Sequence, residues 1–518
     1  MFSSVFHAVL KRCRRLLTHY AGLLSRDEFE PEKKPLLVAI VLLVMILIIS
    51  ATLFFGYQLA TIITSHPFVR GEIPMPAVPA LQESDLAGSE VRTQYMIAAA
   101  LEYASHQMAV AQTLVYVNQA EESLTELLLI VEPNGLPGVF ELEGINWADG
   151  QPIENYKLEG TTLQVLLPAP LPAGERLALS LTYRLSIPAR PSPFGYTENQ
   201  TNLADWYPFV PPYQNGQGWL THQAAKVGEH LAYDIADYHV DIQLIDDNQD
   251  ELTIAASAPA QIKEKRYHYE HKAARNFAWS VSDRYQLLET SVGAVTIQGY
   301  IFPEHTNAGQ ATLQATADAL ALYNDLFAAY PHPSMTFVET DFIDGLEYEG
   351  LYFLNRTYFD QYDGTPQGIL IPLAAHETAH QWWYALVGNN QALEPWLDES
   401  LAVYSELLFY ETYYPELRDW WWQYRILRYQ PQGRPNSTIY DHDNSRDYIN
   451  ATYFRGTLFL DELRNQIGND AFLAFLQNYA AQNTHRQVSS QEFFALLAQH
   501  SSKDLTELKE KYFSPAPP

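Results

Sequence analysis

The sequence predicts a multidomain α+β protein with an N-terminal transmembrane helix, a β-rich domain and a mixed α/β domain. Three observations predict it. A long charge-free apolar stretch lies near the N-terminus, alternating patterns recur over residues 90–292, and helical apolar spacing dominates residues 293–518. With 518 residues, of which 47% are hydrophobic, the chain is long enough for two or three packed domains.

Residues 1–34 are predicted to form a basic amphipathic segment in the cytosol. From Phe2 to Leu24 apolar residues recur at helical spacing, and Lys11, Arg12, Arg14 and Arg15 gather on the opposite face. Such a helix is typical of the surface of an anionic membrane leaflet. Packing against a partner protein is the alternative.

A transmembrane helix is predicted at residues 35–64. No charged residue lies between Leu36 and Ile63, and about 28 helical residues at ~1.5 Å each can cross a bilayer. A cleaved signal peptide would have a shorter apolar region nearer the N-terminus. Only one basic residue, Arg70, lies between the helix and Leu86. Seven basic residues precede the helix: Lys11, Arg12, Arg14, Arg15, Arg26, Lys33 and Lys34. The positive-inside rule therefore predicts a single-pass cell-membrane protein with a cytosolic N-terminus and everything else outside the cytosol.

The next two segments differ in their patterning. Residues 65–89 are rich in proline and lack periodicity, which predicts a stalk. Residues 90–292 contain alternating runs such as Leu177–Ile187 and Tyr238–Leu244, separated by proline and glycine, and are predicted to form a β-rich domain.

The last region, residues 293–518, is predicted to contain most of the helices and the chemistry. Six runs have helical spacing: Gln310–Tyr330, Leu370–Leu386, Pro395–Tyr410, Thr452–Ile467, Ala471–Ala481 and Ser490–His500.

The net charge and the cysteine content argue against two classes of protein, those that bind nucleic acid and those held together by internal disulfides. The formal net charge of -29 argues against a nucleic-acid-binding protein, because nothing in the chain could neutralise a phosphate backbone. Cys13 is the single cysteine, so the chain can form no internal disulfide.

A metal-binding pattern lies in the stretch HETAHQWWYALVGNNQALEPWLDES. His376 and His380 are four residues apart, so on a helix they lie about 40° from one another and can reach one tetrahedral zinc. Glu377 is the next residue round the helix, where it can act as a base toward water at the metal without being a ligand. After eighteen intervening residues, His380 is followed by Glu399, a carboxylate near the start of a second predicted helix. The pattern predicts a catalytic zinc site.

These residues resemble the aminopeptidase N-like family of gluzincin zinc metallopeptidases. HETAHQWW and WLDES, with eighteen residues between the second histidine and the glutamate, carry the resemblance. FIDGLEYEGLYF is similar to the G-x-M-E-N or G-x-M-E-Y-P exopeptidase motif, and ATYFRGTLFLDELRNQIG to the Y-x-K-G segment. The segment LADWYPFVPPYQ to GEHLAYDIADYHVDIQL resembles the end of the family's β domain, so the resemblance runs from about Glu90 to the C-terminus.

The resemblance implies a saddle-like β domain, a thermolysin-like catalytic domain and one zinc ion per chain. It implies His376, His380 and Glu399 as zinc ligands and Glu377 as the general base. It implies further that Glu347 binds the free α-ammonium of a peptide and that Tyr453 stabilises the oxyanion. The implied activity is therefore that of a zinc aminopeptidase acting on peptides with a free N-terminus.

Several positions depart from the family pattern. Leu346 replaces the methionine before the anchoring glutamate, Asp344 replaces the usual first glycine, and Arg455 replaces a common lysine. WLNEG reads WLDES, which places Asp398 and Ser400 beside Glu399. Three alternatives stay open: an endopeptidase of the same clan, a non-catalytic membrane scaffold or receptor, and hydrolysis of a non-peptide such as a lipid epoxide.

Overall fold

The computed structural model describes residues 73–81, 92–246, 251–342 and 344–515. The predicted amphipathic segment and the predicted transmembrane helix at residues 35–64 lie outside these ranges. Within them, no helix is both long enough and apolar enough to cross a bilayer. The first described residues belong to the predicted stalk, and they lie on the β domain. Ile73 is buried against Ala100 and Ala109, and Thr113 Oγ1 donates a hydrogen bond to the Pro79 carbonyl over 2.8 Å.

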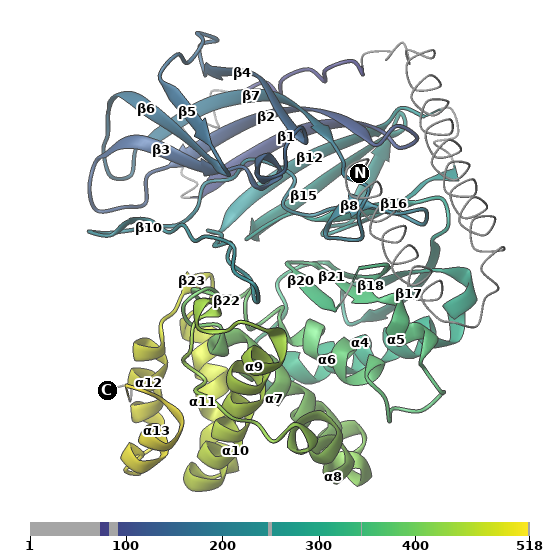
Figure 1. Ribbon diagram of the computed structural model, residues 1–518, viewed down its shortest axis with the longest axis vertical. Coiled ribbons are helices and arrows are strands. Elements are labelled where there is room, and N and C mark those ends of the chain that lie inside the picture. Colours follow the sequence, from purple (N-terminus) through teal and green to yellow (C-terminus); the bar gives the residue numbers. More distant parts are fainter. Residues whose placement is uncertain (1–72, 82–91, 247–250, 343, 516–518) are drawn as a thin grey trace, which may run out of the picture. The chain divides into compact units, whose positions relative to one another are not determined.

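The N-terminal half of the described chain consists of β-sheets, which lie above the helices in Figure 1. The largest sheet has seven strands in the order β14-β15-β12-β1-β2-β7-β4. Its strands are β1 (Thr93–Glu102), β2 (Gln107–Val117), β4 (Phe140–Trp147), β7 (Arg176–Ser186), β12 (Ala236–Leu244), β14 (Ala260–Lys263) and β15 (Arg266–Ala274). The alternation in β7 and β12 places every second side chain in the core, as the sequence predicts.

Three smaller sheets complete this half. One contains β3 (Leu124–Ile130), β5 (Tyr156–Glu159) and β6 (Thr162–Leu171). Another contains β8 (Phe194–Tyr196), β9 (Thr201–Leu203), β13 (Thr253–Ala256) and β16 (Trp279–Ser282), and a hairpin joins β10 (Tyr213–Gln214) to β11 (Gly218–Trp219).

A five-stranded sheet follows in the order β17-β18-β19-β21-β20. Its strands are β17 (Gln286–Val292), β18 (Val295–Ile301), β19 (Ser334–Thr340), β20 (Gly345–Tyr348) and β21 (Leu351–Asn355). The predicted domain boundary between residues 292 and 293 lies within the β17–β18 hairpin. β20 is an antiparallel edge strand, so one of its edges stays open to the space above the helices.

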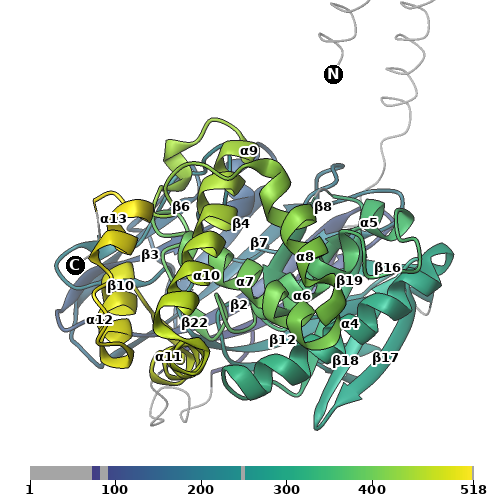
Figure 2. The ribbon, with the colours of Figure 1, turned by 90° about the horizontal axis from the view of Figure 1, so that it is seen from below.

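Helices lie below this sheet and make up the rest of the chain (Figures 1 and 2). They are α4 (Thr306–Leu326), α5 (Arg356–Asp360), α6 (Leu370–Ala379), α7 (Trp396–Tyr413), α8 (Arg418–Trp421), α9 (Ser445–Tyr448), α10 (Gly456–Ile467), α11 (Asn469–Gln482), α12 (Ser490–His500) and α13 (Thr506–Tyr512). Two π-helical segments, Trp422–Ile426 and Ile449–Arg455, and the short pair β22 (Val387–Gly388) and β23 (Arg486–Gln487) complete the region. The prediction of a multidomain α+β fold is confirmed.

One predicted helix is shorter than expected. The run Leu370–Leu386 is helical only to Ala379. Arg275, from the β domain, donates Nε hydrogen bonds to the carbonyls of Tyr384 and Ala385 over 2.7 and 2.9 Å. These tertiary bonds, together with the φ of 130° at Tyr384, turn the chain away from helical geometry.

The link after β20 fixes that strand against the β domain. Glu349 is 1% exposed; one carboxylate oxygen accepts from the backbone N–H of Arg275, and the other lies 2.7 Å from His332 Nε2. The Glu349 N–H donates to Asn276 Oδ1, and the Gly350 N–H donates to Gln381 Oε1. Gly350 has φ +78°, and a Cβ there would overlap a backbone carbonyl, so this position requires glycine. These bonds anchor the turn after β20 to the β domain and to Gln381.

Candidate metal centre and substrate site

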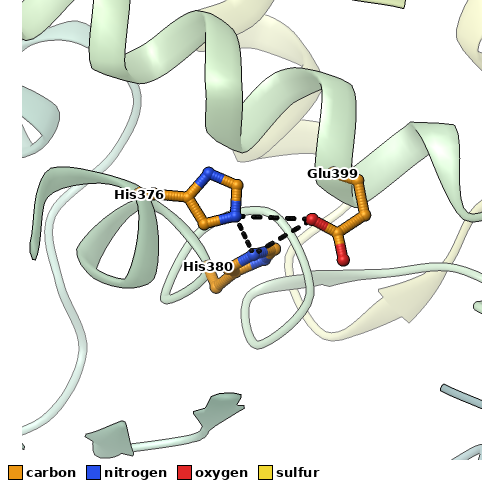
Figure 3. A group of neighbouring side chains, drawn as sticks. All are labelled: His376, His380 and Glu399. Atoms are coloured by element: carbon orange, nitrogen blue, oxygen red, sulfur yellow. Dashed lines mark hydrogen bonds and ion pairs between the residues drawn. The ribbon is translucent and has the colours of Figure 1, made fainter. Parts of the chain in front are cut away.

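His376 of α6, His380 directly after the end of α6 and Glu399 of α7 point toward one another (Figure 3). The two Nε2 atoms lie 3.1 Å apart, and Glu399 Oε2 lies 3.4 Å from His376 Nε2 and 3.6 Å from His380 Nε2. Ligands bound at 2.0–2.1 Å to a tetrahedral ion are separated by about 3.3 Å. The three atoms therefore form one face of a tetrahedron of the size that zinc requires.

The other ring nitrogens orient the two histidines. His376 Nδ1 lies 3.0 Å from Glu406 Oε1, and His380 Nδ1 lies 2.9 Å from the carbonyl oxygen of Trp383. Both acceptors demand a proton on Nδ1, which leaves the lone pair of each Nε2 directed at the common point. The hydrogen bonds thus select the tautomers that bind a metal.

Glu406 is in turn held by a buried network. Arg425 donates to both carboxylate oxygens, from Nε over 2.7 Å and from Nη2 over 2.6 Å, and Trp421 Nε1 adds a third bond of 3.1 Å. Glu406 is 0% exposed, and the charge of Arg425 compensates its burial. This network links the π-helical segment Trp422–Ile426 to the ring of His376.

The electrostatics of the three residues fit a bound cation. Glu399 Oε2 is buried and accepts no hydrogen bond among the described residues. Burial alone would raise the pKa of Glu399, but the two imidazoles lower it to about 2. Burial alone would lower the pKa of His376. The carboxylates of Glu399 and Glu406 have a larger, opposite effect, so the pKa of His376 is raised to about 9. Two nitrogens and one oxygen in a strongly cation-attracting pocket are the donor set of catalytic zinc.

Glu377 lies beside the metal-ligand atoms without joining them. Its Oε2 is buried and accepts no hydrogen bond among the described residues, while Oε1 lies against Gly345 of β20. A Cβ at Gly345 would overlap Oε1, so glycine is needed for this approach. Burial raises the pKa of Glu377 to about 8, with Glu347 and Glu399 adding to the rise and the two histidines opposing it.

Tyr453 lies beside Glu399 and His376, in the π-helical segment Ile449–Arg455. Its hydroxyl donates to Glu399 Oε1 over 2.5 Å, and its ring stacks parallel to that of His376 at 6.1 Å. Burial, followed by the charge of Glu399, raises its pKa well above the ordinary value, so the phenol keeps its proton. It can therefore donate a hydrogen bond to a reacting oxygen.

The predicted ammonium-binding residue, Glu347, faces the same site from β20. Its Oε1 accepts from Gln391 Nε2 over 3.1 Å, and its carboxylate approaches those of Glu229 and Glu399 to within 4.8 Å. The structure thus brings all six predicted residues together.

Glu229 is a site residue that the sequence analysis missed. It lies in the loop before β12, in the β domain, and burial followed by the charge of Glu347 raises its pKa well above the ordinary value. No local pattern marks this residue, because its neighbours in space come from residues more than a hundred positions further along the chain. Only the tertiary fold shows that Glu229 and Glu347 form a pair.

A cavity of about 310 Å³ connects these residues. Glu229 and Glu347 line it together with Glu377, Glu399 and Tyr453. Asp344, which lies two residues before Leu346 and has φ 75°, also lines it and accepts from Tyr358 OH over 3.2 Å.

The sequence profile of the peptidase family M1 domain matches residues 311–512. The chain carries an M1 peptidase domain. Aminopeptidase M1-D of Oryza sativa subsp. japonica is 26% identical over 220 residues, which cover 39% of this chain and 25% of that protein. Human endoplasmic reticulum aminopeptidase 1 is 24% identical over 237 residues, covering 43% of this chain and 25% of that protein. The matched region therefore spans about a quarter of the length of these relatives.

The similarity to solved structures covers more of the chain than residues 311–512. The M1 zinc metallopeptidase of Deinococcus radiodurans has a TM-score of 0.57 and 19% identity, with 81% of this chain and 93% of that chain covered. A mutant of that enzyme with a bound Tyr-Ser-Ala substrate gives a TM-score of 0.57 and 18% identity over 80% of this chain and 92% of that chain. The recognition of an aminopeptidase N-like gluzincin is confirmed, and a single catalytic zinc is the cofactor of this family.

Two departures from the family pattern have a structural role in the M1 peptidase domain. Asp398 Oδ1 accepts the backbone N–H of Glu399 over 2.7 Å at the start of α7. Ser400 Oγ donates to the carbonyl of Thr452 over 2.6 Å, which ties α7 to the segment that carries Tyr453. Both residues therefore fix neighbours of the site rather than change its donor set.

Proposed function

We propose that this chain is a membrane-anchored zinc aminopeptidase that releases N-terminal residues from peptides. The observation that carries the proposal is the pairing of Glu229 and Glu347 beside the metal-ligand atoms. Among the described residues, neither carboxylate forms an ion pair with an arginine or lysine. Two close carboxylates without a cationic partner form a site for an ammonium group.

The position of this pair explains the removal of one residue at a time. An α-ammonium held between Glu229 and Glu347 places the first carbonyl of the peptide near His376, His380 and Glu399. An acetylated N-terminus has no positive charge and would leave both carboxylates without a counter-ion. The site therefore selects free N-termini by charge.

The surrounding side chains supply the acid–base chemistry. Zinc, when bound by the two histidines and Glu399, supplies a Lewis acid that lowers the pKa of water and polarises a carbonyl. The charge of that ion would lower the pKa of Glu377 from the value that burial gives it, so that its free Oε2 accepts the proton of the attacking water and later delivers it to the leaving amine. Tyr453 donates a hydrogen bond to the carbonyl oxygen as that oxygen gains negative charge.

The named relatives support peptide substrates. The relatives from Oryza sativa and human are named as aminopeptidases, and the mutant Deinococcus structure contains a Tyr-Ser-Ala substrate. The proposed hydrolysis of peptides by this chain rests on its own residues Glu229, Glu347 and Glu377. A scaffold protein has no requirement for a complete donor set, a free base and an ammonium site in one cavity.

The decisive experiment compares aminoacyl fluorogenic amides with the same compounds acetylated at the N-terminus. The full chain, purified in a mild detergent with zinc, is expected to cleave only the free amines and to lose activity with chelator or in Glu377→Gln. Equal cleavage of the acetylated substrates would indicate an endopeptidase. No cleavage by a zinc-loaded chain would favour a scaffold or receptor.

The ammonium site has its own test. Glu347→Gln and Glu229→Gln are each expected to raise KM for free-amine substrates by about tenfold or more, because each removes a charge-assisted contact. Glu289→Gln, at an exposed position on β17, is the control and should leave KM unchanged. A KM that stays the same in both site variants would exclude the ammonium role.

The membrane anchor and the extracytoplasmic catalytic region rest on the sequence alone. Because Cys13 is the single cysteine, an impermeant maleimide reports the side on which the N-terminus lies. In intact cells Cys13 should stay unlabelled, whereas a cysteine introduced at the exposed Ile262 should react. Labelling of Cys13 from outside would reverse the proposed orientation.

A further inference from the structure

The active-site cavity borders two further cavities. One end, formed by Gly228, Glu229 and Glu347, is shared with a cavity of about 200 Å³ that Asp205 and Glu132 also line. The opposite end is marked by Tyr429, which also lines a neighbouring cavity of about 440 Å³. Among the described residues none lines both outer cavities, so the acidic pair and Tyr429 border different neighbours of the central cavity.

In the part of the chain that the structure describes, two arginines line the cavity, Arg425 and Arg446. The guanidinium of Arg425 is buried and bound by both oxygens of Glu406, so its charge is already neutralised. Arg446 is exposed, and among the described residues no carboxylate forms an ion pair with it. Arg446 therefore offers the cavity a positive charge that the protein itself leaves available.

A stacked aromatic pair holds Arg446 in this position. Its guanidinium carbon lies 4.3 Å from the centroid of the Tyr429 ring, and that ring stacks on Phe454 at 5.3 Å and 19°. Stacking on an aromatic face leaves the N–H groups at the edge of the guanidinium free to donate. Planar guanidinium donors of this kind match the two oxygens of a carboxylate.

We propose that Arg446 forms a carboxylate-binding subsite at the Tyr429 end of the cavity, and that the preferred substrates are short peptides whose C-terminal carboxylate reaches it. The inference rests on the proposed aminopeptidase function. A short peptide with free ends carries an ammonium at one end and a carboxylate at the other, which matches the two ends of the cavity. With its ammonium between Glu229 and Glu347, the peptide runs past the metal ligands toward Arg446.

The test measures binding apart from hydrolysis. The full chain with Glu377→Gln, loaded with zinc, is titrated calorimetrically with trialanine and with trialanine amide. Trialanine should bind at least about tenfold more tightly than its amide, the difference expected for one charge-assisted carboxylate contact. Adding Arg446→Gln should reduce the ratio of the two dissociation constants to about one.

Arg428→Gln is the matched control. The Arg428 guanidinium lies 4.6 Å from the centroid of the same Tyr429 ring, but this residue does not line the cavity. In this variant the ratio of the dissociation constants of trialanine amide and trialanine should stay as it is without the substitution. An unchanged ratio in Arg446→Gln, or an equal loss of the ratio in both arginine variants, would overturn the subsite.

A third peptide separates the two possible sources of a carboxylate. Ala-Glu-Ala amide carries the group on a side chain instead of at the C-terminus. Weak binding of this peptide supports recognition of the chain end, whereas binding as tight as that of trialanine would overturn the preference for short peptides. If trialanine binds in the Arg446-dependent way but the wild-type chain cleaves no peptide, the proposed function fails while the subsite stands.

Discussion

Replacing Glu406 with glutamine removes a buried charge that orients a predicted metal ligand. Glu406 accepts four hydrogen bonds, from His376 Nδ1, Arg425 Nε, Arg425 Nη2 and Trp421 Nε1. Glutamine preserves the shape of the side chain, but its NH2 group would face donors where the carboxylate accepts. Arg425 would also lose the counter-charge that compensates its burial.

The expected magnitudes follow from these contacts. Loss of a carboxylate behind a ligating histidine weakens metal binding by about 10- to 100-fold. A buried guanidinium left without its partner costs about 3–5 kcal/mol of unfolding free energy. Trp421→Phe removes only one of the four bonds, so its effect on zinc affinity should be several times smaller.

The assay is competition for zinc between the full chain and a chromogenic chelator, together with urea unfolding of the zinc-free protein. Glu411→Gln is the control, because Glu411 lies on the same helix and pairs with Arg418 and Arg464 away from the site. A zinc dissociation constant in Glu406→Gln equal to that of the wild type would refute the orienting role.

Three further predictions concern single residues near the site. Gly345→Ala should lower kcat by about 100-fold with little change in zinc affinity, because the added methyl displaces Glu377. Tyr453→Phe should lower kcat by about 10²–10³-fold with KM nearly constant, since its hydroxyl acts on charge that develops during reaction. Burial raises the pKa of Glu349, but His332, His271 and Arg275 lower it to about 2. A carboxylate with a lowered pKa stabilises the fold at pH values above its unfolded pKa of about 4.3. This contribution to the unfolding free energy should fade as the pH drops from about 5 to 2. Glu349→Gln should abolish that part of the pH dependence of the unfolding free energy.

Each of these predictions has a measurement that contradicts it. Wild-type kcat in Gly345→Ala would mean that Glu377 does not need its observed position. A rise in KM alone for Tyr453→Phe would indicate a role in binding. An acid unfolding profile of Glu349→Gln parallel to that of the wild type would show that the turn after β20 is not stabilised by this charge.

The adjacent acids Glu347 and Glu349 show where local patterning stops being informative. Residues two apart on a strand share a face, so alternation alone would place both carboxylates in the same cavity. In the structure β20 ends at Tyr348, and Glu349 lies in the turn that leads through Gly350. Glu347 therefore faces the cavity, while Glu349 is buried against the β domain.

The sequence by itself determined the features that depend on neighbours along the chain. The four-residue spacing of His376 and His380 places both rings on one side of α6, because the helical period is a local property. The alternating strands and most helix positions follow for the same reason, since local spacing decides which face is apolar.

Only the tertiary structure decided the contacts between distant segments. The sequence around one residue of such a contact does not indicate its partner. Three contacts are of this kind: Glu229 with Glu347, Glu406 with His376, and Arg446 with Tyr429. The early end of α6 has the same origin, because Arg275 binds carbonyls more than a hundred residues further along the chain. These arrangements depend on how sheets and helices pack, and long-range packing is not encoded in any short stretch of sequence.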